Sequence, residues 1–253
     1  MDEYPEEPIS GAGLEDRNLV RVGDTVRRPA GHWTPSVQHL LGDLRARGFD
    51  LAPDPRGVDR HGREVLSYIE GRDQGFPFIP EILSDEGAEE LGRLTRRLRE
   101  LLSAYPCAAD ARWQCAEGAP TPGEALQHGD LGPWNLLWGD RQRVVGVLDW
   151  DFAGPGDPWY DTGHLAWFTV PLMDDDRAGQ RGFPSPPDRH ARLEAFATGA
   201  GVSSRELVQV VLRAQAEYER RVSTRSGPWA TFRQMGLNEK ARGDRLWTAR
   251  HFA

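Results

Sequence analysis

Apolar and polar residues alternate over short stretches in the first seventy positions. Residues 19–22 and 25–28 flank Gly23-Asp24, a pattern that predicts a β-hairpin closed by a two-residue turn. A second hairpin is predicted around Asp59–Gly62, where turn-forming residues precede a β-prone segment. Between the hairpins, apolar residues recur at helical spacing and predict a helix over 35–47. We therefore expect a small antiparallel sheet with one helix.

Helical spacing dominates after Glu70-Gly71, where we place the boundary between two units. Ser84 can cap a helix whose apolar stripe consists of four leucines, Leu91, Leu94, Leu98 and Leu101. A further hairpin is predicted over 136–149, and helices over 158–168, 188–199, 203–222 and 229–241. A sheet-rich segment followed by a helix-rich one is typical of an α+β fold. The predicted units are residues 1–70 and 71–253.

The charge of the chain bears on its partners. Its 253 residues carry 31 basic and 39 acidic side chains, which gives a net charge of −8 at pH 7. Nucleic-acid binding requires a basic surface that displaces counterions, so we expect no nucleic-acid partner. The only lysine is Lys240, because all the other basic residues are arginine. Any mechanism that needs a lysine elsewhere is therefore excluded.

The sequence carries no signal for a membrane, a disulfide framework or a zinc site. No apolar run approaches the ~20 residues that a membrane span needs. Cys107 and Cys115 are too few for a disulfide framework, and no Cys/His set has zinc-binding spacing. The N-terminal segment 1–7 is acidic, where a signal peptide would be basic and then apolar. We therefore expect a cytoplasmic protein without a membrane partner.

An acid and an amide, Asp130 and Asn135, lie five residues apart in a turn-rich segment that begins at His128. The predicted hairpin that follows leaves Asn135 and returns to it, so Asn135 and Asp149 can converge at one edge of the sheet. Two hard oxygen ligands suit a Mg²⁺ ion that takes its remaining ligands from water and phosphate. Asp130 would face the phosphate bound to that metal. This arrangement is typical of phosphoryl transfer to a hydroxyl group.

Two motifs in this region are similar to those of a known family. The motif His-Gly-Asp-x-x-x-x-Asn is matched by His128, Gly129, Asp130 and Asn135. An aspartate after a buried strand, followed by Trp-Tyr-Asp, is matched by Asp149 and by Trp159-Tyr160-Asp161. The chain therefore resembles the aminoglycoside phosphotransferase and choline kinase branch of the protein-kinase-like fold, most clearly over 123–170.

The resemblance implies a two-lobed fold, with a small antiparallel β-sheet in the nucleotide-binding N-terminal lobe and a mainly helical C-terminal lobe. It also implies transfer of the γ-phosphoryl group of ATP, or of GTP, to a hydroxyl group of a small molecule. By position, Asp130 resembles the catalytic base, and Asn135 and Asp149 resemble the magnesium ligands. His128 belongs to the same catalytic loop, which it would hold by hydrogen bonds. Asp161 resembles the buried acid that braces this loop.

The nucleotide-binding residues depart from the family pattern. Ser67, Tyr68 and Ile69 lie where such kinases hydrogen-bond adenine through backbone groups. The strand lysine that grips the α- and β-phosphates has no counterpart, and either Arg27 or Arg28 is the available substitute. An ion pair at a sheet edge explains either arginine equally well.

Other features of the sequence leave alternatives open. The glutamate that pairs with the family's lysine is missing from the predicted helix, and Ser10–Gly13 is at best an abbreviated Gly-rich phosphate loop. Asp151 could contact metal, substrate or only water. The tryptophans around the motifs, Trp134 among them, are predicted to pack in the core and loops rather than to stack on a ligand.

The acceptor has no motif of its own. Candidates are an amino sugar, another antibiotic, an amino alcohol, a sugar, or a Ser/Thr hydroxyl of a natural-product precursor peptide. The rival function is a catalytically impaired, kinase-like binding or immunity module, which the reduced N-terminal lobe favours. Against it stand Asp130, Asn135 and Asp149, which a binding module would not need together.

Overall fold

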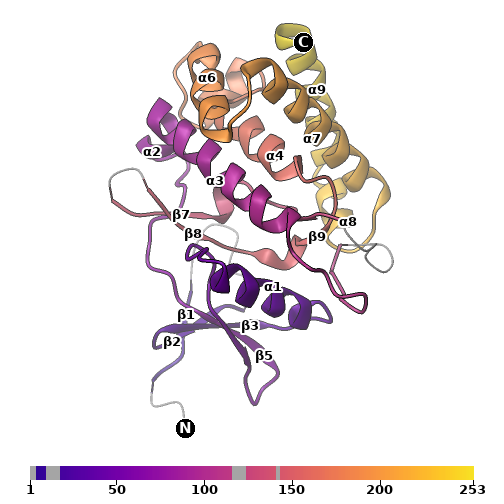
Figure 1. The fold of residues 1–253 in the computed structure, drawn as a ribbon. Coiled ribbons are helices and arrows are strands. Elements are labelled where there is room, and N and C mark those ends of the chain that lie inside the picture. Colours follow the sequence, from indigo (N-terminus) through magenta and orange to yellow (C-terminus); the bar gives the residue numbers. More distant parts are fainter. Residues whose placement is uncertain (1–3, 10–17, 116–123, 141–142) are drawn as a thin grey trace.

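A computed structural model describes residues 4–9, 18–115, 124–140 and 143–253 of the chain. It has a small lobe built on a β-sheet and a larger lobe built mainly of helices, and the two are stacked along the long direction in Figure 1. The C-terminus lies at the far end of the helical lobe. The predicted α+β class is confirmed.

The small lobe contains a five-stranded antiparallel sheet with the strand order β1-β2-β3-β5-β4. Its elements are β1 (Glu7–Pro8), β2 (Val20–Val22), β3 (Thr25–Pro29), α1 (Thr34–Ala46), β4 (Pro55–Val58) and β5 (Arg63–Ser67). Both predicted hairpins are confirmed, since β2 pairs with β3 and β4 pairs with β5. The register of β3 and β5 places Arg28 directly opposite Glu64.

Helix α1 follows the predicted apolar spacing. Its four inward-facing side chains have no exposed surface, and they are Val37, Leu40, Leu41 and Leu44. The helix contacts β4 in the small lobe and the 3-10 turn over residues 150–152 in the large lobe. This apolar face therefore joins the sheet to the rest of the molecule.

The large lobe consists mainly of α2 (Pro80–Leu83), α3 (Asp85–Ser103), α4 (Tyr160–Thr169), α5 (Asp175–Gln180), α6 (Arg189–Ala200), α7 (Ser204–Thr224), α8 (Pro228–Gln234) and α9 (Leu237–Phe252). Helix α3 begins as predicted, because the Ser84 hydroxyl accepts the N–H of Gly87 at 3.0 Å. The last leucine of its buried stripe is Leu102. Leu101, which we expected there, is only partly buried.

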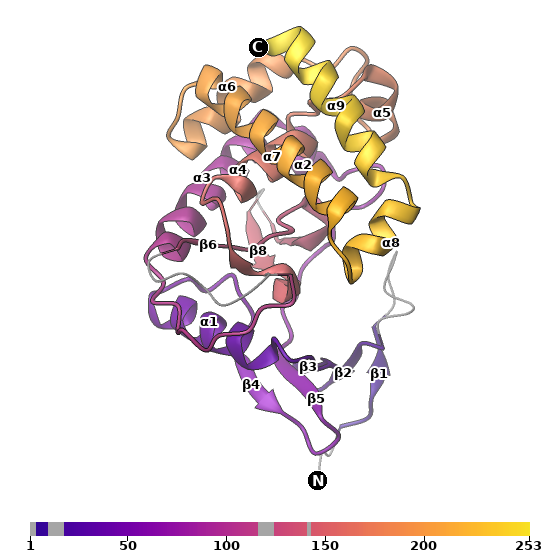
Figure 2. The same cartoon turned by 90° about the vertical axis from the view of Figure 1, so that its right-hand side faces the viewer.

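Two short antiparallel pairs lie between the sheet and the helices. Strand β6 (Leu126–Gln127) pairs with β9 (Gly154–Pro155), and β7 (Leu136–Trp138) pairs with β8 (Val144–Val147). Figure 2 shows β6 and β8 between α1 below and helices α4 and α7 above. The segments that join these strands carry the predicted motifs, so the two hairpin-like pairs position them between the lobes.

The C-terminal region differs from the prediction. The single helix expected over 229–241 is in fact two helices, α8 and α9, because the chain turns at Gly236 with a φ of +69°. Helix α5 was not predicted at all. No helix in the described part of the chain is both long enough and apolar enough to span a bilayer.

Helices α3 and α6 pack with their backbones in close contact. A Cβ atom added to Gly92 of α3 would lie 2.2 Å from the carbonyl oxygen of Phe196 in α6. A Cβ atom added to Gly199 of α6 would lie 2.1 Å from the carbonyl oxygen of Glu89 in α3. Both obstacles are backbone atoms, so the helices would have to separate to admit a side chain.

We expect Gly92→Ala to lower the free energy of unfolding by about 1–3 kcal/mol, because overpacking forces backbone shifts. The matched control is Gly243→Ala in α9, where an added Cβ meets nothing within 4 Å. That change should raise the free energy of unfolding by roughly 0.5–1 kcal/mol, since alanine restricts the unfolded chain more than glycine. Urea unfolding measures both. Equal effects of the two substitutions would contradict the close helix contact.

Candidate active site

The loop between β6 and β7 is held by a buried carboxylate. Asp161, at the start of α4, accepts the backbone N–H of His128 at 2.6 Å and that of Gly129 at 2.9 Å. Burial raises the pKa of Asp161, while the nearby His128 and the two N–H donors act in the opposite direction. Gly129 has a φ of +85°, and an added Cβ would lie 2.2 Å from the carbonyl oxygen of Phe152. The loop therefore requires glycine at this position.

His128 links the loop to the end of β8. Its Nε2 lies 2.9 Å from the carbonyl oxygen of Leu148, and its Nδ1 lies 3.4 Å from the backbone nitrogen of Asp130. These partners assign the ring proton to Nε2, which donates, and leave Nδ1 to accept. Complete burial lowers the pKa of the imidazole, so the ring is neutral at pH 7. Its contacts are those of a residue that holds the loop.

Asp130 and Asn135 are in direct contact. The Asn135 amide nitrogen donates to the backbone oxygen of Asp130 at 2.8 Å and to its carboxylate Oδ2 at 3.0 Å. The indole nitrogen of Trp134 donates to the same Oδ2, also at 3.0 Å. Because the Asn135 nitrogen is turned toward Asp130, its amide oxygen is turned away and remains the atom suited to a cation.

Trp134 was predicted only to pack in the core and loops, and its hydrogen bond to Asp130 was not predicted. Its side chain is 40% exposed, and its ring packs edge-on against His164 and Phe168. The indole ring lies against Gly132, where only a glycine leaves room for it. A Cβ atom added to Gly132 would lie 2.2 Å from the ring. The Gly-Pro-Trp sequence before Asn135 was the available signal.

Asp149 lies two residues after the end of β8 and next to Asn135 along the hairpin. The backbone N–H of Leu148 donates to the carbonyl oxygen of Asn135 at 2.8 Å, which fixes the two chain segments side by side. Asp149 adopts a left-handed conformation with a φ of 56°. Such backbone conformations in residues other than glycine are enriched at functional sites.

Arg28 of β3 reaches this region from the small lobe. Its Nη2 donates to Asp151 at 2.6 Å, its Nη1 lies 3.5 Å from Asp149, and its Nε donates to Glu64 at 2.6 Å. Burial alone would lower the pKa of Arg28, but the three carboxylates outweigh burial and raise it. Burial also raises the pKa of Asp151, against the effect of Arg28. One guanidinium group thus bridges the two lobes.

The other arginine of the predicted pair lies elsewhere. Arg27 bonds the hydroxyl of Thr25, and its Nε lies 3.8 Å from Asp59. Successive residues of a strand point to opposite faces. Of the two candidates, it is therefore Arg28 that the structure brings to Asp149.

The predicted adenine-binding segment is partly engaged within the small lobe. The backbone N–H of Ser67 donates to Asp54 at 2.9 Å, and that of Tyr68 donates to Asp24 at 2.8 Å. A nucleotide would therefore have to use the carbonyl groups here, or the backbone of Ile69. The predicted phosphate loop, Ser10–Gly13, lies outside the described residues.

The chemistry of the donor set fits a hard divalent cation, since carboxylate and amide oxygens are the ligands that Mg²⁺ prefers. The carboxylates of Asp149 and Asp151 are joined through Arg28, and the amide oxygen of Asn135 is turned away from Asp130. Among the described residues, no group of three or more His, Cys, Asp or Glu side chains forms a metal site.

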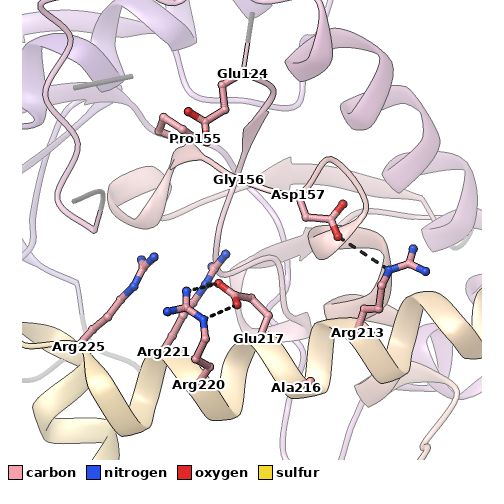
Figure 3. A pocket seen from close by; sticks show the side chains of 10 residues that line it. All are labelled: Glu124, Pro155, Gly156, Asp157, Arg213, Ala216, Glu217, Arg220, Arg221 and Arg225. Carbon is pink, nitrogen blue, oxygen red and sulfur yellow. Dashed lines mark hydrogen bonds and ion pairs between the residues drawn. The ribbon is translucent and has the colours of Figure 1, made fainter. Parts of the chain in front are cut away.

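A separate cavity of about 550 Å³ lies between α7 and the loop after β9 (Figure 3). None of the predicted site residues lines it. Its arginines face acids, as Figure 3 shows for Arg213 and Asp157 and for Arg220 and Glu217. Partial burial would raise the pKa of Glu217, but Arg220 and Arg221 lower it to about 2. The charges lining this cavity are therefore largely paired.

The chain is similar in sequence to known phosphotransferases and to an immunity protein. Residues 104–196 match the sequence profile of a family described as the phosphotransferase enzyme family. The chain is 32% identical over 205 residues to the trifolitoxin immunity protein of Rhizobium leguminosarum bv. trifolii, an alignment that covers 78% of this chain and 75% of that protein. It is 33% identical over 159 residues to the viomycin phosphotransferase of Streptomyces vinaceus, with 60% of this chain and 45% of that enzyme covered.

A solved structure shows the same fold. The microcompartment-associated aminopropanol kinase superposes with a TM-score of 0.55 at 19% identity, over 99% of this chain and 93% of that one. The fold expected from the motifs, a two-lobed kinase-like fold, is confirmed.

His164 of α4 lies beneath the candidate site and was assigned no role from the sequence. It is fully buried among aromatic rings, including Trp134 and Tyr160. Its Nδ1 lies 3.1 Å from the carbonyl oxygen of Leu131, to which it donates. Burial lowers the pKa of His164 from 6.5 to about 4. Protonation of this ring therefore opposes folding.

We expect the free energy of unfolding to fall as the pH decreases from 6.5 to 4, because the unfolded chain binds a proton at His164 in that window and the folded chain does not. The contribution of this residue is about 2–4 kcal/mol at pH 4. His164→Phe should remove this part of the pH dependence, as measured by urea unfolding across the window. The same substitution at the exposed His190 is the control. Identical pH dependence of the wild type and His164→Phe would rule out the buried neutral ring.

Proposed function

Because this chain belongs to the phosphotransferase enzyme family, we propose that it transfers the γ-phosphoryl group of ATP to a hydroxyl group of a small molecule. The observation that carries the proposal is the direct contact of Asp130 with Asn135, next to Asp149. A loop acid beside two oxygen donors is the arrangement that phosphoryl transfer requires. If this segment were only a turn, its fold would not require Asp130, Asn135 and Asp149 to lie together.

In this proposal, the carboxylate of Asp130 orients the acceptor hydroxyl and takes its proton. The acceptor oxygen forms a bond to the γ-phosphorus as the bond from that phosphorus to the bridging oxygen of ADP breaks. Trp134 and Asn135 hold the carboxylate in place by their N–H groups. Most of the rate enhancement of such an enzyme comes from positioning and charge stabilisation.

The nucleotide would be held from both lobes. Arg28 is the cation available to its phosphates, and guanidinium groups bind phosphate oxygens in pairs. A Mg²⁺ ion, when bound to Asp149, Asp151 and Asn135, supplies positive charge that offsets the charge of the phosphates. The segment Ser67–Ile69 would contact the base. GTP could replace ATP without a change in any of these roles.

The names of the relatives guide the proposal for the acceptor. One relative is named as an immunity protein toward trifolitoxin and another as a phosphotransferase of viomycin. We propose that the acceptor is a toxin or antibiotic carrying a hydroxyl group, with amino sugars, amino alcohols and short peptides as the classes to test. Mass spectrometry of a panel of such compounds after incubation with enzyme and Mg-ATP identifies a phosphorylated product.

A non-catalytic immunity module is the second candidate. The observation in its favour is the name of the first relative, which states immunity and no enzymatic activity. Such a module would sequester its ligand without consuming nucleotide. Calorimetry with Mg-ATP separates the two candidates, because only the enzyme needs to bind it.

We expect Asp130→Ala to lower turnover by about 10²–10⁴-fold, since it removes the proposed general base. Binding of Mg-ATP should remain largely intact, because this carboxylate is assigned to the acceptor. Steady-state kinetics and calorimetry measure the two quantities separately. The control is Asp176→Ala, an exposed acid of α5 far along the chain from the motifs. Parallel loss of binding and turnover in Asp130→Ala would refute the assigned role.

Trp134→Phe tests how Asp130 is held. The substitution keeps an aromatic ring against His164 and Phe168 but removes the N–H that donates to the carboxylate. We expect kcat to fall by about threefold to tenfold, the value of one such hydrogen bond, with the KM for Mg-ATP unchanged. Trp247→Phe in α9 is the control for loss of an indole. A change in the KM for Mg-ATP alone would place Trp134 on the nucleotide side instead.

A further inference from the structure

Arg28 satisfies three carboxylates with three different nitrogen atoms. Its Nε pairs with Glu64 of the small lobe. In the large lobe, Nη2 pairs with Asp151 and Nη1 with Asp149. The side chain is only 12% exposed. An arginine does not lose its proton in this environment, so a fixed positive charge lies at the carboxylates proposed to hold the metal.

The Nε side of this cluster is anchored. Glu64 is completely buried and is the cross-strand neighbour of Arg28. Its other oxygen accepts the side-chain N–H of Gln38 from α1 at 3.2 Å. Gln38 is itself clamped to Gly57, since its amide nitrogen donates to the backbone oxygen at 3.0 Å and its amide oxygen accepts the N–H at 2.9 Å. Glu64 therefore holds one edge of the guanidinium in place.

The Nη side is the part that can change partners. A divalent ion at Asp149 and Asp151 would compete with Arg28 for the same oxygens and would be repelled by its charge. A bound triphosphate reverses this situation, because its oxygens offer the Nη atoms new anionic partners. The metal and the guanidinium can then share the site, with the phosphates between their charges.

We propose that Arg28 is an exchangeable counter-cation of the metal site. Without nucleotide it occupies Asp149 and Asp151 and excludes the divalent ion. With nucleotide it passes to the phosphates while Glu64 retains its Nε, so that metal and nucleotide bind together. This inference rests on the proposed function, because it takes Asp149 and Asp151 as metal ligands.

The test measures binding of Mn²⁺, a paramagnetic substitute for Mg²⁺, by electron paramagnetic resonance with and without ATP. For the wild type we expect weak binding of Mn²⁺ alone and much tighter binding with ATP. In Arg28→Met, Mn²⁺ alone should bind at least about tenfold more tightly, which corresponds to about 1.4 kcal/mol. Binding of Mn-ATP to this variant should be weaker than to the wild type.

Two further variants keep the test decisive. Arg28→Met leaves three clustered carboxylates without their cation, so it can fail to fold. The double variant Arg28→Met/Glu64→Gln removes one charge of each sign and should bind Mn²⁺ alone more tightly in the same way. Arg63→Met is the matched control, because Arg63 on β5 pairs with Glu6 and Asp59 instead. It should behave as the wild type.

The outcomes separate this inference from the proposed function. If the wild type binds Mn-ATP but the Arg28 variants bind Mn²⁺ alone no more tightly, the counter-cation role is wrong and the proposed function stands. If the wild type does not bind Mn-ATP while the variants bind Mn²⁺ more tightly, Arg28 guards a metal site and the proposed kinase function is wrong.

Discussion

The carboxylate of Asp161 and the two backbone N–H groups that it accepts are the interaction on which the site depends. Burying an acid is unfavourable unless donors satisfy it, and here the donors are His128 and Gly129, the two residues before Asp130. These bonds impose the left-handed turn at Gly129 and thereby fix the direction in which the chain reaches Asp130. The neutral His128 ring adds a tie to the end of β8. The position of Asp130 is thus set from helix α4 and from β8 at once.

The second constraint lies in the small lobe and concerns the acid that pairs with the buried Arg28. A buried cation needs an acid held in place beside it. In the family that the sequence resembles, that acid is expected on the helix. Here α1 offers the neutral Gln38, and Glu64 comes from the strand paired with that of Arg28. Strand register is a more rigid determinant than the packing of a helix, because a shift by one residue would turn the side chain to the other face. The cation and its anchor therefore move as one unit with the sheet.

The features that the sequence could predict are those encoded locally. Both hairpins of the small lobe and α1 follow from turn residues and apolar spacing. The choice between Arg27 and Arg28 could not be predicted, since it depends on which sheet face meets the large lobe. The hydrogen bond from Trp134 to Asp130 was not predicted, because it depends on the fold of the loop around Gly132. The break between α8 and α9 had a local signal in Gly236, which the apolar spacing obscured.

A net charge of −8 would by itself favour a cationic acceptor, but the pairing of the acids in the structure weakens that argument. Three acids of the candidate site, Glu64, Asp149 and Asp151, are paired with Arg28. In the cavity beside α7, Glu217 is likewise paired with Arg220 and Arg221. Paired charges produce a weaker field than their number implies, because each cancels its neighbour at a distance. Beside Asp130 the ring of Trp134 is 40% exposed, so under the proposed function an acceptor would meet an aromatic surface there as well as charge.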